Sequence, residues 1–279
     1  MLDQLKSRNI ADILIYLLSH GSATKSDLVR GTTLGNSTVS DAINELTALK
    51  LVRSIGKEDS IGGRRSTIYE ISKSYGCFIG IAFCDDKIEF VVTDCRNEIV
   101  KAWRVGLNSQ LSAISILLHE LSRIVVGEKN VLGIGVGLHG EIDYGAQIVT
   151  YCANPHWQHV HLKEIIEREL LTFTIIDHYA NGAALMEKYL GVARNIDDFI
   201  YHTVLAPQKM AVFLDGNICR GKNNMAGRLD NTEFTSDVAH LQHIWDVEKV
   251  FIADAKEYDL ARGMAISAEV KWFGRALKR

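Results

Sequence analysis

Cysteine is scarce in this chain, and no two cysteines stand close together. The five of them are scattered over 279 residues without a CxxC pair, at Cys77, Cys84, Cys95, Cys152 and Cys219. Neither a disulfide framework nor a zinc ribbon is therefore indicated. We expect most of these thiols to be small residues of the core.

Long apolar runs are missing as well. The stretch ILIYLLSHG is soon interrupted by polar residues and a glycine, and the N-terminus lacks the layout of a signal peptide. We expect a cytoplasmic protein without a membrane partner.

An excess of positive charge is also absent, since the formal net charge at pH 7 is -3. Any contact with DNA must then come from a local patch and from the symmetry of a dimer. With 47% hydrophobic residues, the chain can bury more than one core, so two domains are expected.

The first part of the chain has the periodicity of three helices. An amphipathic helix that ends at Gly21 is predicted from apolar residues at helical spacing, which are Ile10, Ile13, Leu14, Leu17 and Leu18. In the following ATKSDLVRG, Thr24 and Asp27 have the spacing of a capping box for a second, short helix. Gly31 and Gly35 then give the backbone more conformational freedom, which favours a turn after this helix.

A third helix is predicted to start at Asn36 or Ser37. Its apolar residues recur on one face, at Val39, Ile43, Leu46 and Leu49. Small polar side chains are left to point outward or to lie at the helix start, namely Asn36, Ser37, Thr38, Ser40, Asp41 and Asn44. Such groups can bond to base edges or to backbone oxygens in a major groove. Helix amides at the N-terminus also favour phosphate.

The segment LVRSIGKEDSIGGRRSTIYEIS predicts two strands around a turn, with Lys57, Arg64 and Arg65 near its tip. Two strands after such a helix pair are typical of a winged helix-turn-helix, and double-stranded DNA is the expected partner. The candidate DNA-binding residues are Thr24, Lys25, Asn36, Ser37, Thr38, Ser40, Asn44, Arg64 and Arg65. The alternative is a three-helix packing module that touches no DNA, which helix periodicity alone does not exclude.

A polar joint, SKSYG, marks the expected boundary between a first domain at 1–73 and a second at 74–279. The second begins with the apolar or alternating segments CFIGIAFC, KIEFVVTD and EIVKAWRVG, which predict an antiparallel meander. A helix from about Ser109 to Val126, the strand VLGIGVGLHG, the helix HLKEIIERELL and the strand TFTIID follow. This order favours an α/β sheet of ribonuclease H-like or actin-like type.

Several motifs together resemble the ROK group of repressors, open reading frames and sugar kinases. They are NSTVSDAINEL, GGRRS, GIGVGLHGEID, NPHW, HYANGAALMEKYLG and LDGNICRGKNNMAG, and they extend over nearly the whole chain. The resemblance implies an actin-like domain with a shortened second lobe, and the N-terminal winged helix places the chain with the repressors. The fold class expected is therefore a two-domain α+β and α/β chain.

The parts that a kinase of this group needs are altered. The first phosphate loop corresponds to GIAFCDDKI, where Asp85 and Asp86 would repel phosphates. Tyr179 stands where the group has its catalytic aspartate, and an ordinary tyrosine pKa of about 10 makes it a poor base at neutral pH. The second phosphate loop corresponds to LAPQKMAVF, where Pro207 removes an amide from the cradle. We expect no phosphoryl transfer and no enzymatic activity.

The sugar contacts implied by the resemblance differ as well. The group holds sugar hydroxyls at positions that here are His178, Tyr179, Arg228 and Asn231, and Asn154 of NPHW completes the candidate ligand set. Because arginine replaces a carboxylate, an anionic ligand such as a sugar phosphate or sugar acid becomes conceivable. The alternative is a site that has decayed and binds nothing.

No metal or other cofactor is expected. The zinc module of the group is replaced by TEFTSDVAHLQHIWDVEKVF, which has no cysteine. His156, His159 and His161 lie close in sequence without a fixed carboxylate or cysteine, and His240 and His243 lack a third ligand. The glycines of GIGVG indicate a strand packed closely on its neighbours, since no helix begins directly after it.

The sequence thus predicts a sequence-specific transcriptional regulator of ROK type, with repression as its expected action. A homodimer or higher homo-oligomer is expected because one short recognition helix reads few base pairs. The alternatives are a sugar kinase or sugar-binding protein of the same group, and a non-catalytic oligomeric scaffold.

Overall fold

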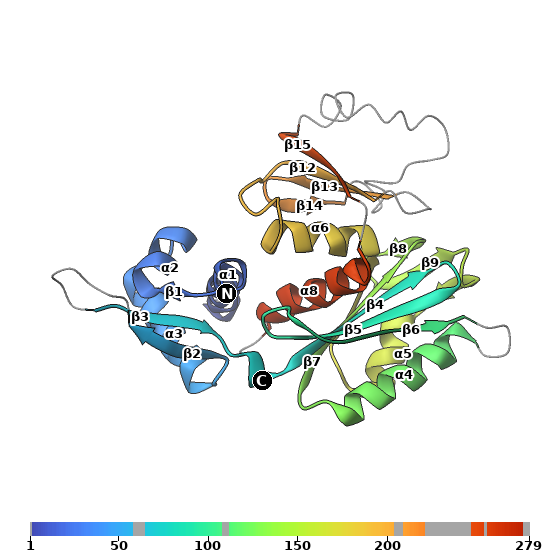
Figure 1. Cartoon of the computed structure of the whole chain (residues 1–279), viewed down its shortest axis with the longest axis horizontal. Helices are drawn as coiled ribbons and strands as arrows, with labels where there is room; N and C mark the ends of the chain where they lie inside the picture. Colours follow the sequence, from blue (N-terminus) through green and yellow to red (C-terminus); the bar gives the residue numbers. More distant parts are fainter. Residues whose placement is uncertain are drawn as a thin grey trace.

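The computed structural model describes residues 2–57, 65–107, 112–203, 209–220, 247–253 and 256–275. Its first part, here called the N-terminal module, contains helices α1 (Leu2–His20), α2 (Lys25–Thr32) and α3 (Asn36–Ala48) and strands β1 (Ala23–Thr24), β2 (Val52–Lys57) and β3 (Thr67–Ile71). The strands form an antiparallel sheet in the order β1-β3-β2. The three predicted helices and the two predicted strands are confirmed. Figure 1 shows this module in blue, beside the rest of the molecule.

Helical spacing explains how α1 packs. Ile13 and Leu14 are fully buried, and Ile10 and Leu17 are 1% exposed, so one face of the helix is inserted in the core. The helix ends before Gly21, whose φ of +78° is a left-handed conformation that glycine adopts without strain. On α3 the residues Val39, Ile43 and Leu46 are buried as predicted, but Leu49 is 42% exposed because the helix has already ended at Ala48.

The rest of the described chain, here called the large module, contains the remaining elements. They are η1 (Lys73–Tyr75), β4 (Cys77–Cys84), β5 (Lys87–Asp94), β6 (Ile99–Gly106), α4 (Ala113–Gly127), β7 (Val131–Leu138), β8 (Glu141–Asp143), β9 (Ile148–Cys152), β10 (Trp157–Val160), α5 (Leu162–Leu170), β11 (Thr174–His178), α6 (Tyr179–Tyr189), β12 (Phe199–Thr203), β13 (Lys209–Leu214), β14 (Asn217–Cys219), β15 (Lys249–Ala253) and α8 (Asp259–Phe273). None of the described helices combines the length and the apolar character needed to cross a bilayer.

A five-stranded sheet in the order β11-β7-β4-β5-β6 is the centre of this module. The predicted meander is confirmed, because β4, β5 and β6 pair antiparallel, while β7 pairs parallel with β4 and β11 pairs parallel with β7. Helices α4 and α5 cover one face, and α8 and α6 cover the other (Figure 1). A second sheet, β14-β13-β12-β15, packs on α6 through apolar residues such as Ala183, Phe199 and Phe213.

Helix α8 joins the parts of the molecule, although it is formed by the last described residues. Glycines in the sheet let it approach closely: a Cβ on Gly80 would lie 1.8 Å from the carbonyl oxygen of Ala261, and one on Gly135 would lie 2.0 Å from that of Met264. The far end of α8, with Trp272 and Phe273, belongs to the same apolar cluster as the core of the N-terminal module. The two modules therefore share one continuous core.

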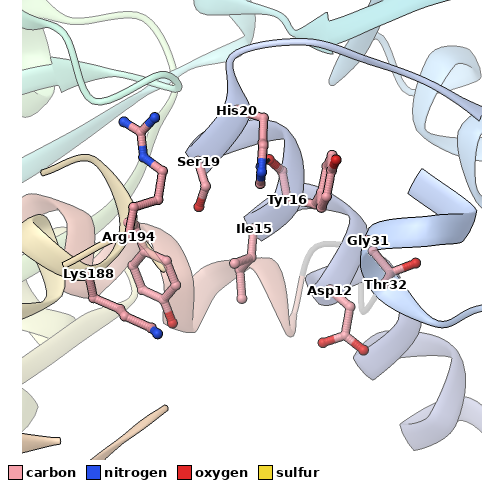
Figure 2. Close-up of a pocket in the computed structure, with 10 residues that line it drawn as sticks. Asp12, Ile15, Tyr16, Ser19, His20, Gly31, Thr32, Lys188 and Arg194 are labelled. Carbon is pink, nitrogen blue, oxygen red and sulfur yellow. Dashed lines mark hydrogen bonds between the residues drawn. The ribbon is translucent and has the colours of Figure 1, made fainter. Parts of the chain in front are cut away.

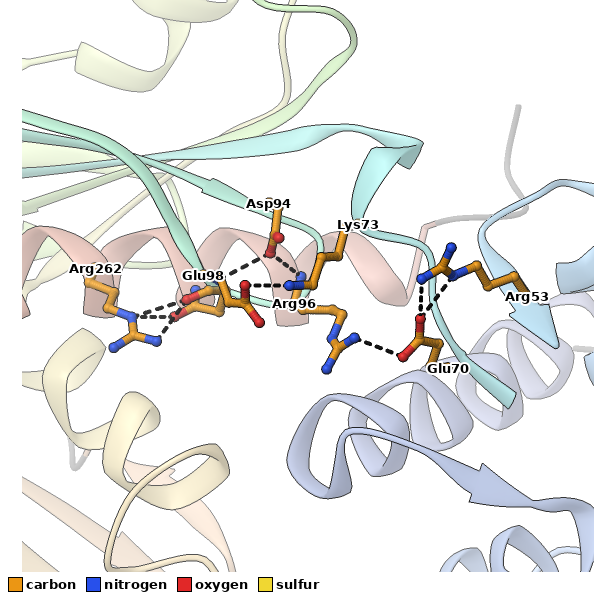
Figure 3. A network of polar contacts seen from close by, with 8 residues as sticks. Arg53, Glu70, Lys73, Asp94, Arg96, Glu98 and Arg262 are labelled. Carbon is orange, nitrogen blue, oxygen red and sulfur yellow. Dashed lines mark hydrogen bonds and ion pairs between the residues drawn. The ribbon is translucent and has the colours of Figure 1, made fainter. Parts of the chain in front are cut away.

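A polar network lies beside this shared core (Figure 3). Glu70 of β3 is 6% exposed and accepts hydrogen bonds from Arg53 Nε at 2.8 Å and from Arg96 at 2.7 Å. Arg96 lies in the turn between β5 and β6, which is shaped by Asp94 as it accepts from the backbone N–H groups of Arg96 and Glu98. One buried carboxylate on the central strand of the N-terminal sheet thus connects this sheet to the large module.

Replacing Glu70 by glutamine is expected to lower the free energy of unfolding by about 1–3 kcal/mol, because two arginines lose their charged acceptor in a buried position. Urea unfolding followed by circular dichroism measures this change. The matched control is Glu45→Gln, which breaks an exposed pair with Lys6 and should cost less than about 1 kcal/mol. Equal losses in the two variants would contradict a special role for the Glu70 network.

Candidate nucleic-acid interface

The start of α2 is held by a capping box. The backbone N–H and the hydroxyl of Thr24 donate to Asp27 Oδ2 at 2.9 and 2.7 Å, and the Asp27 N–H donates to Thr24 Oγ1 at 3.2 Å. The hydrogen bonds from the Thr24 side chain and backbone lower the pKa of Asp27, so the carboxylate stays ionised at the helix N-terminus.

The capping box also determines the environment of Thr24 itself. The residue is only 3% exposed and its hydroxyl is engaged in the cap, so it has no free surface for a phosphate or a base. It orients the residues that follow it, Lys25 and Ser26, which stand at the exposed start of α2.

The polar face of α3 is exposed as its periodicity predicts. Asn36, Ser37, Asp41 and Asn44 are exposed, while Thr38 and Ser40 are half-buried. Lys25 of α2 reaches across to α3 and donates from Nζ to Ser40 Oγ at 2.8 Å. The two helices thereby present one continuous polar surface.

A groove of about 300 Å³ lies between the start of α2 and the base of β3. It is lined by Lys25, Ser26, Arg65, Ser66, Thr67 and Tyr69. Two of these side chains are cationic, the others carry hydroxyl groups, and none is acidic. Arginine, lysine and hydroxyl donors beside a helix N-terminus are the groups that bind phosphate oxygens.

Four of the groove residues were not among the predicted ones. Ser26 is adjacent to Lys25, and Ser66 and Thr67 directly follow Arg65, so their neighbours in sequence are the signal that could have found them. Tyr69 carries no such signal, because only the pairing of β3 with β1, where Tyr69 lies opposite Ala23, brings it to the groove. Arg64 lies outside the described residues.

Three of the ligand residues predicted in the large module lie among the described residues. Asn154 is exposed in the turn before β10 and donates through Nδ2 to the carbonyl oxygen of Asp85. His178 ends β11 and is half-buried, whereas Tyr179 begins α6 and is 3% exposed. Arg228 and Asn231 lie outside the described residues.

Tyr179 is buried against acidic and thiol groups. Its pKa is raised above the usual tyrosine value by burial first, and then by Cys84, Asp85 and Cys152. A phenol with a raised pKa stays protonated at neutral pH, so it does not act as the general base that the aspartate of a kinase provides.

An ion pair that the sequence did not indicate lies directly beside these residues. The buried Asp177 accepts from Arg220 at 2.6 and 3.1 Å, from Asn181 Nδ2 at 2.8 Å and from the His178 N–H at 2.8 Å. The Arg220 guanidinium also lies 3.3 Å from the ring centroid of Tyr144. Four donors therefore occupy the Asp177 carboxylate, and little of it is left for the hydroxyls of a sugar.

The signal for this pair in the sequence is weak. Asp177 immediately precedes HYAN, but Arg220 lies 43 residues further along the chain. No group of three potential metal ligands occurs among the described residues, which include His156, His159 and His161; His240 and His243 lie outside them.

Comparisons with known proteins agree with this architecture. A model described as the ROK family matches residues 78–235. The chain is 28% identical over 231 residues to a protein named xylose repressor from Bacillus spizizenii, which covers 81% of this chain and 60% of that protein. The chain thus spans about 60% of the length of this relative.

Two solved structures share the fold. A crystal structure of a ROK family transcriptional regulator, a homologue of the Escherichia coli Mlc protein, superposes with a TM-score of 0.69 at 15% identity, over 84% of this chain and 61% of that one. A ROK family glucokinase from Streptomyces griseus, in complex with glucose and AMPPNP, has a TM-score of 0.50 at 23% identity, over 58% of this chain and 52% of that one. At these identities the likeness concerns the fold alone.

Proposed function

The chain belongs to the ROK family, and from that premise we propose that it is a sequence-specific DNA-binding transcriptional regulator that acts as a repressor. The observation that carries the proposal is the basic groove at Lys25 and Arg65, which adjoins the exposed polar face of α3. A cationic groove positions the protein on phosphates, and amide and hydroxyl side chains on the adjacent helix contact bases.

In this proposal the N-terminal module is a winged helix-turn-helix domain at 1–73. Helix α3 enters the major groove, with Asn36, Ser37, Thr38, Ser40 and Asn44 facing the DNA. Arg65, together with Arg64, contacts phosphate or the minor groove from the wing. The similarity to a protein named xylose repressor supports this assignment.

The large module, residues 74–279, is proposed to be a ROK-type actin-like domain with a shortened second lobe. We propose that it holds two copies of the chain together, because two symmetric half-sites supply the specificity that one short helix lacks. We also propose that this domain binds a sugar-derived or anionic small molecule that controls DNA binding. The candidate ligand-binding residues are Asn154, His178, Tyr179, Arg228 and Asn231.

Fluorescence anisotropy with labelled DNA from upstream of the protein's own gene tests the central proposal. Binding should be saturable, should exceed binding to shuffled DNA of the same composition, and should weaken steeply as salt rises. Equal affinity for both DNAs would contradict sequence-specific regulation. Dimerisation without any DNA binding would favour the oligomeric scaffold instead.

The kinase alternative leads to a separate prediction. An ATP-coupled assay over hexoses and amino sugars is expected to give no turnover above a protein-free background. The reason is that Tyr179 has a raised pKa at the place of the catalytic base, and that two acids, Asp85 and Asp86, occupy the turn after β4. Sugar-dependent ADP formation that scales with protein concentration would overturn this expectation.

A further inference from the structure

A cavity of about 350 Å³ lies between the N-terminal module and the large module. It is lined by Asp12, Ile15, Tyr16, Ser19, His20, Gly31, Thr32, Lys188, Tyr189 and Arg194, which come from α1, α2, the end of α6 and the turn after it (Figure 2). We propose that this cavity is a binding site for a neutral, polyhydroxylated molecule of monosaccharide size, separate from the predicted ligand residues around His178. Binding of the molecule does not depend on the proposed function. Only the expected effect of the molecule, which is control of DNA binding, rests on that function.

One wall of the cavity holds a carboxylate that can still accept hydrogen bonds. Asp12 is half-buried, and it accepts no hydrogen bond from any described residue, although Arg8 lies near enough to interact with its charge. Burial raises the pKa of Asp12, and its charge in turn contributes, after burial, to the raised pKa of Tyr189. A partly desolvated carboxylate without donors is stabilised by a ligand that supplies them.

The opposite wall holds donors. Lys188 is 9% exposed, and it donates to the carbonyl oxygen of Ile196 at 2.7 Å and to Asp197 at 2.6 Å, which leaves one of its three N–H groups. Arg194 is exposed and donates to the carbonyl oxygen of Leu190 at 2.9 Å. Figure 2 shows Lys188 and Arg194 across the cavity from Asp12.

An aromatic surface lies between these polar walls. The rings of Tyr16 and His20 stack at 3.9 Å with an interplanar angle of 9°. Gly31 makes room for this stack, since a Cβ there would lie 1.9 Å from Tyr16 Cε2. Together with Ile15, the stacked rings contribute apolar atoms to the lining of the cavity, against which the C–H groups of a ligand can pack.

These walls together select the class of ligand. An anion would be repelled by Asp12, and a cation by Lys188 and Arg194. A neutral polyol satisfies both walls, because its hydroxyl groups donate to the carboxylate and accept from the cationic side chains. The volume is at the small end of the range of ligand sites, about 300–1,000 Å³, which suits a single sugar ring.

The position of the cavity supplies a route to control. A ligand held there would contact α1 and α2 of the N-terminal module and the end of α6 at the same time. It would therefore favour one arrangement of the modules over others, and a ligand with such a preference shifts the DNA affinity.

Isothermal titration calorimetry on the full chain without DNA tests the site. The probes are D-xylose and D-glucose as neutral sugars, D-glucose 6-phosphate as the anion and D-glucosamine as the cation. At least one neutral sugar should bind more tightly than both charged probes. Asp12→Asn should weaken that binding by about tenfold or more, as expected for loss of a hydrogen bond to a charged group. Arg194→Gln, at an exposed position that does not endanger folding, should weaken it measurably as well.

Glu164→Gln, on the exposed surface of α5, is the matched control and should bind the sugar like the wild type. The proposal is overturned if no neutral sugar binds at millimolar concentration. It is also overturned if Asp12→Asn, shown by thermal unfolding to be folded, binds normally while His178→Ala does not, which would place the sugar in the large module. Because calorimetry is done without DNA, failure here leaves the anisotropy test of DNA binding unaffected.

Discussion

Replacing Lys25 and Arg65 together by alanine should lower the affinity for the specific DNA by at least about tenfold at low salt, because each cation is expected to make a charge-assisted contact with phosphate. The slope of log affinity against log salt should become shallower by about one unit for each lost phosphate contact. Both cations line the same groove, and Lys25 is already positioned by its hydrogen bond to Ser40. Anisotropy titrations at several salt concentrations measure both quantities.

The matched control removes two exposed arginines from the large module, Arg123 on α4 and Arg168 on α5. It changes the net charge by the same amount, and these helices lie on the far side of the molecule from the N-terminal module (Figure 1). The control should keep the affinity and nearly the same salt slope. If both double variants lose affinity equally, overall charge and not the groove governs binding.

Gly135→Ala is expected to destabilise the protein by about 3 kcal/mol or more, at the upper end of the cost of overpacking. The added Cβ would lie 2.0 Å from the carbonyl oxygen of Met264, which belongs to the backbone of α8 and cannot turn away as a side chain can. Helix and sheet would have to separate, and α8 also packs on the core of the N-terminal module. Urea unfolding followed by circular dichroism measures the loss.

Gly127→Ala is the control for this substitution. Gly127 ends α4, and an added Cβ there would meet no atom within 4 Å. Its stability should stay within about 1 kcal/mol of the wild type, since alanine is the better helix former. A Gly135→Ala protein as stable as this control would show that α8 does not need the close approach.

Elements held together by local interactions were predictable from the sequence. The capping box joins Thr24 and Asp27, which are three positions apart, and the apolar stripe of α1 repeats at each turn. The meander β4–β5–β6 follows the alternation of its strands and two short turns. The close packing predicted for GIGVG is confirmed, because Gly133 packs on Phe78 and Gly135 packs on the backbone of α8.

Contacts between distant residues were not predictable in this way. The burial of Thr24 was not predictable, because packing, and not the type of side chain, decides whether a hydroxyl is exposed. Asp177 lies in β11 and Arg220 directly follows β14, while Glu70 and Arg96 come from different modules, so no spacing in the sequence predicts either pair. The candidate ligand residues of the large module rest on the family resemblance, and Tyr179 is buried because the start of α6, to which it belongs, packs on Gly137 of β7.

The sequence by itself determined the three helices of the N-terminal module, the meander β4–β5–β6, the polar face of α3 and the presence of cations between β2 and β3, because each depends on residues that are close together in the chain. Only the tertiary structure decided that Lys25 and Arg65 line one groove, that α8 joins the two modules, and that Asp12 lies across a cavity from Lys188. These features depend on the distance between elements that are far apart in the sequence. Packing of the whole core sets that distance, including the contact of Gly135 with Met264 of α8.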